Sequence, residues 1–262
     1  GLLIAVPPLL LAAHFLGSAD PLLGEVFARW TTFFSEDALR HVIVSFVIAW
    51  PVAGWLGGVV NARGSAEPRA AIGTGVFAFA GIAPTLYGLV ILLATYLGLQ
   101  ARVLFGGVAY LAETAGLTVA EYARGGFFQL VAVAALVLGA LFLADRFLSR
   151  DDADAARRFR AAGLALLVLV AVLILSAFAR MGLYVRYFGL TDERVYALTG
   201  MVWIGVALGW FGWTVLRGRA EHFGSGVLLA TVLWVVSLNA LNPEALVARV
   251  NVARAVAGEA FD

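Results

Sequence analysis

The stretch AAGLALLVLVAVLILSAFA, residues 161–179, carries no charged side chain and is bordered by an arginine at each end. As an α-helix, an apolar run of this length can cross the hydrocarbon core of a bilayer, which is about 30 Å thick. Backbone groups in lipid must be paired within the protein, so a spanning segment is either a helix or a strand of a closed barrel. The run lacks the alternation of a barrel strand, and we therefore predict a transmembrane helix.

Similar runs recur along the whole chain, and charged residues gather in short stretches between them. Of the 262 residues, 62% are hydrophobic and 13% are charged, whereas about 25% of the residues of an average soluble domain are charged. The sequence predicts an all-α integral membrane protein, with one helical domain over residues 1–262 and about seven transmembrane helices. The predicted spans are Leu2–Gly17, His41–Val60, Ile72–Leu99, Phe127–Ala144, Ala161–Ala179, Val195–Leu216 and Ser225–Leu241. Because the chain starts with Gly and its first run does not read as a signal peptide, we expect it to be part of a longer precursor.

Composition and motifs argue against several classes of function. The net charge of +1, without a basic stripe, argues against a nucleic-acid partner. The chain has no cysteine, which excludes disulfides and thiolate metal sites. The histidines His14, His41 and His222 lack the spacing of a metal site. No phosphate-binding glycine loop, nucleophile elbow or zinc-protease motif occurs, so we expect no metal, cofactor or catalytic residue.

The arginines suggest an orientation in the membrane. The eighteen arginines divide equally between the two predicted sides, but the loop 145–160 carries five of them. Short arginine-rich loops have most weight in the positive-inside rule, so we predict that this loop is cytoplasmic. The connections predicted on the opposite, extracytoplasmic side are 18–40, 100–126, 180–194 and the tail from 242.

Helical patterns and capping signals are concentrated on that opposite side. Residues 21–34 place apolar side chains at helical spacing, which predicts an amphipathic helix lying along the membrane surface. Thr118 and Glu121 have the spacing of a capping box. Asn242 is a candidate N-cap, and Glu244 follows in the first turn, where the helix dipole favours an anion.

The charged segment RMGLYVRYFGLTDERVY, residues 180–196, allows two interpretations. In the first, it is mainly a turn, and Arg180 anchors the end of the fifth span at the headgroup level. In the second, Arg180, Arg186 and Arg194 hold an anionic headgroup or a partner's carboxylate, since planar guanidinium groups suit both. The candidate contacts with a partner or a lipid are Arg124, Arg180, Arg186, Arg194, Asn242, Glu244 and Arg249.

Five ordered stretches resemble a known family. They are GLLIAVPPLLLAAHFLGSADPLL, QARVLFGG, VAEYARGGFFQLVAVAALVL, RMGLYVRYFGLTDERVYAL and LNPEALVARVNVARA. Together they resemble bacterial polytopic membrane proteins classed as a domain of unknown function, the 4173 type and its relative, the 4153 type. The resemblance covers nearly the whole chain. It implies a multi-pass protein of the bacterial cytoplasmic (inner) membrane, without an assigned activity.

Two functions remain open from the sequence. The first is a non-enzymatic structural, accessory or signalling-linked component that binds another membrane protein or a lipid through its extracytoplasmic face. The alternative is a transporter or lipid-handling protein with a path between kinked helices. No charged residue lies near the middle of a predicted span, which argues against ion-coupled transport. A cavity at Gln129 or Pro84 would favour the alternative, whereas a packed interior with an exposed apolar flank would favour the first.

Overall fold

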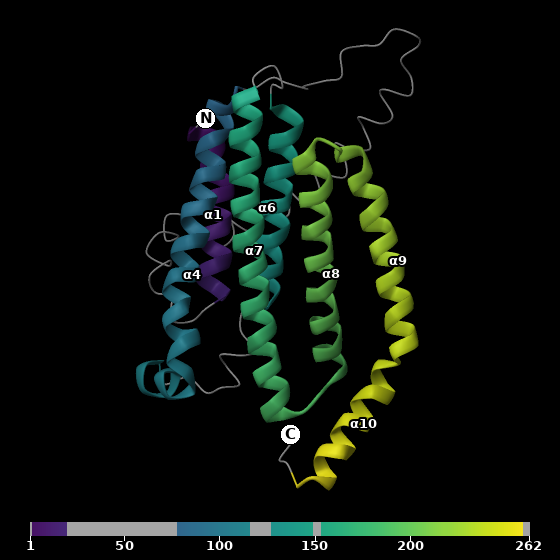
Figure 1. The fold of residues 1–262 in the computed structure, drawn as a ribbon. Helices are drawn as coiled ribbons and strands as arrows, with labels where there is room; N and C mark the ends of the chain where they lie inside the picture. Colours follow the sequence, from purple (N-terminus) through teal and green to yellow (C-terminus); the bar gives the residue numbers. More distant parts are fainter. Residues whose placement is uncertain (1, 20–77, 116–126, 149–152, 259–262) are drawn as a thin grey trace.

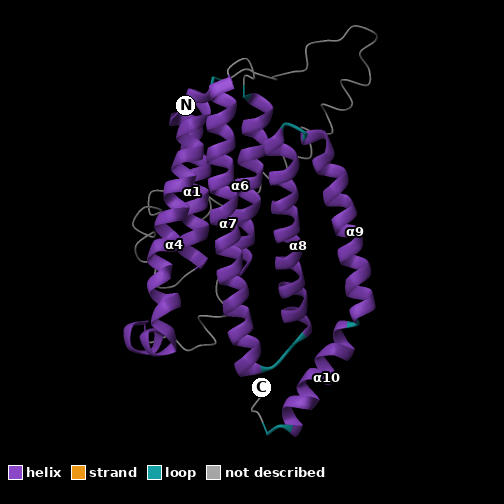
Figure 2. Ribbon diagram, viewed as in Figure 1, coloured by secondary structure: helices purple, strands orange, loops and turns teal. Residues whose placement is uncertain are grey.

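The computed structural model describes residues 2–19, 78–115, 127–148 and 153–258, which form helices joined by short connections (Figures 1 and 2). No strand occurs among these residues, so the predicted all-α class is confirmed for this part of the chain. The helices are α1 (Leu2–Ala19), α4 (Phe79–Ala115), α6 (Phe127–Phe147), α7 (Ala153–Phe188), α8 (Asp192–Thr214), α9 (Phe223–Leu241) and α10 (Pro243–Val256). Two 3₁₀ turns, η1 (Val215–Arg217) and η2 (Ala220–His222), join α8 to α9.

Five of the described helices, α4, α6, α7, α8 and α9, are long and apolar enough to cross a membrane. Each coincides with a predicted span, but five is fewer than the seven spans expected. The first expected span is α1, whose apolar part, Ala5–Ala19, is shorter than the others. The second, His41–Val60, lies outside the described residues. The surface helix predicted at 21–34 and the capping box at 118–121 also lie outside them.

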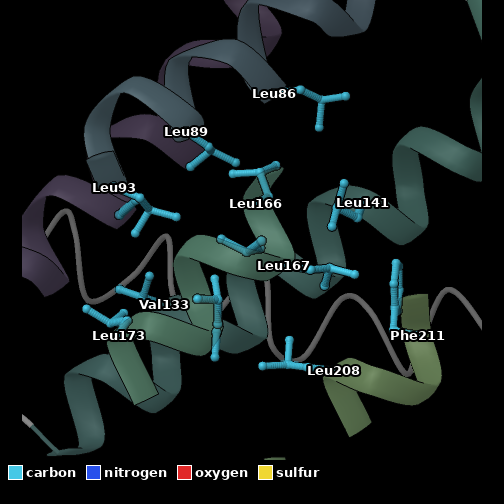
Figure 3. Close-up of a cluster of buried hydrophobic side chains, with 14 of the residues drawn as sticks. Leu86, Leu89, Leu93, Val133, Leu141, Leu166, Leu167, Leu173, Leu208 and Phe211 are labelled. Atoms are coloured by element: carbon cyan, nitrogen blue, oxygen red, sulfur yellow. The ribbon is translucent and has the colours of Figure 1, made fainter. Parts of the chain in front are cut away.

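The hydrophobic core lies between α1, α4, α6 and α7, and α8 covers one side of it. Figure 3 shows leucines of α4 and α7 pointing toward one another and toward side chains of α6 and α8. The fully buried side chains include Leu86, Leu89 and Leu93 of α4, Val133 and Leu141 of α6, Leu166 and Leu173 of α7, and Phe211 of α8. In lipid, where apolar surface gains little from burial, such packing is a main source of helix association.

Two glycines allow helices to approach closely at the edges of this core. A Cβ added at Gly88 would stand 2.8 Å from the end of the Leu9 side chain, so α1 and α4 meet there. A Cβ at Gly163 would stand 2.6 Å from Leu216 Cδ2, so the start of α7 packs against η1. Small residues at helix contacts are the usual device for such packing in membranes.

The helix α9 lies at the outer edge of the bundle, beside α8, and α10 turns back from its end (Figure 1). None of the residues of α9 is buried by the described part of the chain. Phe223 and Trp234 of α9 still contact aromatic rings of α8, but most of the apolar surface of α9 is exposed.

Candidate functional site

The segment from Arg180 to Tyr196 contains more helix than expected. The helix α7 does not end with the predicted span at Ala179 but continues to Phe188. Gly189 follows with a φ of 77°, the left-handed conformation in which glycine commonly ends a helix. The connection to α8 is therefore three residues long, 189–191, and the first turn of α8 carries Asp192 and Glu193.

Arg194 holds this connection together from within the chain. Its Nη1 donates hydrogen bonds to the carbonyl oxygens of Phe188, at 2.9 Å, and Gly189. Its guanidinium carbon lies 4.0 Å from the centroid of the Tyr184 ring, a cation–π distance. The last carbonyls of a helix lack partners within the helix, and Arg194 supplies one for α7. That Arg194 contacts a partner or a lipid stays a prediction.

The cap predicted for the tail is confirmed. Asn242 is the N-cap of α10, and its side chain accepts a hydrogen bond from the backbone N–H of Ala245 at 3.3 Å. Its φ of 47° is left-handed, a conformation that asparagine tolerates better than most residues. Pro243 occupies the first position of the helix and Glu244 its first turn. The left-handed residue separates α9 from α10 and turns the chain.

The tail helix returns to the α7–α8 connection through two residues that sequence reasoning missed. The amide of Asn251 pairs with the backbone of Leu190: Oδ1 accepts from the N–H at 3.0 Å, and Nδ2 donates to the carbonyl at 2.8 Å. Arg254 donates to the carbonyl oxygens of Val185, at 3.0 Å, and Arg186, at 2.7 Å. Asn251 and Arg254 are three residues apart on one face of the helix, and this spacing was the available signal.

The other candidate residues lie around these contacts between α10 and the α7–α8 connection. Arg124 lies outside the described residues. Arg186 and Arg249 are exposed, as are Asn242 and Glu244. Asn242 and Glu244 belong to the end of α10 that adjoins α9, whereas the other end contacts the connection. Arg254 thus bonds to the backbone of Arg186, while Arg194 and Asn251 bond to neighbouring residues of the same connection.

Arg180 does not end its helix as predicted: it is 3% exposed and lies eight residues before the end of α7. That it anchors the span at the headgroup level stays a prediction. Gly163 packs against Leu216, and Gly212 packs against Leu167. This antiparallel register places Arg180 opposite the turn of α8 at residue 199, about 10 Å from the start of α8. Arg180 is therefore buried in the bundle, but it lies outside the predicted span 161–179 and away from the middle of α7, so the expectation that no charged residue lies near the middle of a span is not contradicted.

One turn away from Arg180, the structure has a buried set of hydrogen bonds between α4 and α7. Ser176 Oγ donates to Gln100 Oε1 at 3.1 Å, and Gln100 Nε2 donates to Tyr96 Oη at 3.3 Å. Tyr96 and Gln100 are fully buried, and Ser176 is 6% exposed. We call these three residues the α4–α7 polar contact. Buried polar groups in lipid need such partners, and the contact fixes the register of the two helices.

Two apolar grooves open on the outer helices. One lies between α7 and α8 and has a volume of about 600 Å³. The other lies between α8 and α9, has a volume of about 490 Å³, and is closed at one end by Trp210, whose Nε1 donates to the carbonyl of His222 at 3.2 Å. Neither groove is lined by Gln129 or Pro84. Within the described residues, no group of three or more acidic or histidine side chains could hold a metal ion.

Comparison with known proteins gives a family match over the whole chain. The model of a family described as "Domain of unknown function (DUF4153)" matches residues 1–262. This finding confirms the resemblance seen in the sequence. No curated protein and no solved structure matches the chain.

Proposed function

The chain belongs to the DUF4153 family, and from this premise and its architecture we propose that it is a non-enzymatic accessory component of the bacterial cytoplasmic membrane. In this proposal, it binds another membrane protein through its α9–α10 flank, on the extracytoplasmic side. The apolar helices α4, α6, α7, α8 and α9 support a multi-pass membrane protein. The binding of a partner and the side of the membrane on which it binds are proposed.

The main support for this proposal is that α9 is a long apolar helix of which no residue is buried by the described chain. Its most exposed large apolar side chains, Leu228 and Leu229, are 67% and 60% exposed. By contrast, α7 contributes thirteen buried residues to the described structure. A helix that is apolar all round is suited to lie among other helices or in lipid.

The flank is also held in a fixed position, which a docking surface requires. At one end of α9, Trp210 bonds to His222, and its indole fills the space beside Gly226. At the other end, α10 is fastened to the α7–α8 connection by Asn251 and Arg254. Because both ends are fixed, the exposed apolar surface of α9 has a defined shape before any partner binds, which lowers the entropic cost of binding.

The transporter alternative has one observation in its favour. Arg180 is buried and stands one turn from the α4–α7 polar contact, and intramembrane charges often mark transport paths. Against it, the α4–α7 polar contact is satisfied by its own hydrogen bonds, and the side chains around it pack closely. The two grooves open on the surface of the bundle between α7 and α8 and between α8 and α9, and neither is lined by the residues of the α4–α7 polar contact. We therefore favour the accessory role.

A photo-crosslinking experiment in native membranes tests the proposal. A photoreactive amino acid replaces Leu228 of α9, which is 67% exposed, or Ile91 of α4, which is 66% exposed and serves as the matched control. We expect position 228 to form a discrete adduct with one protein, identified by mass spectrometry, and position 91 to react with lipid. Equal, lipid-only labelling at the two positions would contradict the proposal.

The proposed orientation has its own test, made simple because the chain contains no cysteine. Ala153 and Thr191 are exposed at opposite ends of the bundle, since α7 and the connection after it separate them. Cysteine at position 191 is expected to react with an impermeant thiol reagent in intact cells, and cysteine at position 153 only after permeabilisation. The reverse result would place the α10 side in the cytoplasm.

A further inference from the structure

The groove between α7 and α8 is long and narrow. It runs along α7 from Leu164 to Phe178, which is about 21 Å at 1.5 Å per residue. Its volume is about 600 Å³, or on average about 29 Å² of cross-section over that length. The groove therefore has the elongated shape and the width that a hydrocarbon chain needs.

The lining of the groove is apolar and open to the side. Leu164, Val168 and Leu175 are 59%, 54% and 66% exposed and form one wall. On the other wall, Gly205 and Gly209 of α8 have no neighbouring atom within 4 Å of where a Cβ would stand. The groove is also longer than one leaflet of a bilayer, which is about 15 Å thick in its hydrocarbon part. The whole length of an acyl chain from one leaflet can thus lie within the groove.

Two arginines stand at one end of this groove. Arg160 precedes Leu164 by four residues, which places it one turn beyond the lining on the same face of α7. Arg217 belongs to η1, next to Leu216, and Leu216 packs against Gly163. The contact between Gly163 and Leu216 brings the turn of Arg160 and the turn of Arg217 to the same level. Both side chains are exposed.

The charge at this end is positive. The described residues at this end, 145–148, 153–160 and 215–222, carry six arginines and three carboxylates. Asp154 pairs with Arg157 at 2.8 Å, and Glu221 lies 3.2 Å from His222. Arg217 lies over the Trp213 ring, at 3.9 Å from its centroid, a position typical of a membrane interface. The same end belongs to the side for which the sequence predicts a cytoplasmic location, and the cytoplasmic leaflet is rich in anionic lipid.

We propose that this groove binds one anionic phospholipid, with an acyl chain along Gly205 and Gly209 and the phosphate between Arg160 and Arg217. Guanidinium groups bind phosphate through paired hydrogen bonds, so two of them at one mouth favour a charged headgroup over a zwitterionic one. Lipid binding here is independent of the α9–α10 flank, and its failure would leave the proposed accessory role untouched.

Native mass spectrometry of the purified full chain, titrated with phosphatidylglycerol or phosphatidylcholine, tests the headgroup contact. Each arginine near anionic lipid contributes about 1 kcal/mol, or about fivefold in affinity. The double variant Arg160→Gln/Arg217→Gln should therefore lose about thirtyfold in affinity for phosphatidylglycerol and little for phosphatidylcholine. Arg158→Gln, which removes an exposed arginine of α7 from a different face of the helix than Arg160, is the matched control. An unchanged preference for phosphatidylglycerol in the double variant would overturn the proposal.

A second experiment tests the chain-binding groove. Phosphatidylglycerol with a photoreactive acyl chain is expected to label α7 and α8 between Leu164 and Gly212, and Gly209→Leu should abolish this labelling. Gly98→Leu is the control, because Gly98 of α4 is equally open. Labelling spread evenly over all helices, or a disulfide between two copies of the chain carrying Val202→Cys, would show that lipid is not the specific occupant.

Discussion

The replacement of Asn251 by alanine is the most direct test of how α10 is fastened. In the structure, the Asn251 amide makes two hydrogen bonds with Leu190, at 3.0 and 2.8 Å, across 61 positions of the chain. Leu190 is only 7% exposed, so water replaces these bonds poorly. The variant keeps the helix-forming backbone but removes both bonds.

The expected loss follows from these contacts. A hydrogen bond of this kind contributes about 0.5–1.5 kcal/mol net, so two contribute about 1–3 kcal/mol, and a buried N–H left without a partner moves the value toward the upper end. Arg254 still fastens α10 in the variant, through its bonds to the end of α7 at 3.0 and 2.7 Å. We therefore expect α10 to detach more often while the bundle stays folded.

Hydrogen–deuterium exchange measures this opening directly, because the N–H of Leu190 donates to Asn251 in the closed state. A loss of about 2 kcal/mol corresponds to about thirtyfold faster exchange at this amide. Asn251→Asp should give an intermediate rate, since it keeps the acceptor for the N–H and loses the donor. Peptides from the middle of α7 should exchange as in the unchanged protein.

Asn239→Ala is the matched control. Its amide bonds only to the carbonyl of Val235, at 2.9 Å, within α9, and is exposed. If Leu190 exchanges at the same rate in Asn251→Ala and Asn239→Ala, the inference that Asn251 fastens α10 is wrong.

Three further outcomes are expected from the same structure. Arg194→Lys should lower the free energy of unfolding by about 1–2 kcal/mol in denaturant titrations, because lysine lacks the planar group that caps α7 and stacks on an aromatic ring. Arg186→Lys, at an exposed site, should change the free energy of unfolding little. Equal effects of the two substitutions would contradict the capping role of Arg194. Gln100→Leu should cost about 1–2 kcal/mol, since it removes one hydrogen bond from each of two buried hydroxyls. An unchanged melting temperature would argue against the α4–α7 polar contact. Gly226→Ala should shift the fluorescence emission maximum of Trp210 to longer wavelengths, because a Cβ at position 226 overlaps the indole ring and displaces it. Gly224→Ala should leave the emission spectrum unchanged.

The local parts of the fold were predictable. The spans that became α4, α6, α7, α8 and α9 follow from the length and hydropathy of single segments, which do not depend on distant residues. The cap at Asn242 was predictable for the same reason, because it joins a side chain to a backbone N–H three residues away. The end of α7 was missed, although Gly189 marks it, because hydropathy fell at Arg180 before the helix ended.

The sequence by itself determined that the chain is a helical membrane protein, because a segment's own length and composition decide whether it lies in lipid or in water. Tertiary structure alone decided that Arg180 is buried, that Ser176 bonds to Gln100 across 76 positions, and that Arg254 reaches Val185 across 69. These pairings depend on how separate helices are rotated and aligned against one another. In lipid, that alignment comes from close packing and a few polar contacts, which hydropathy along the chain does not encode.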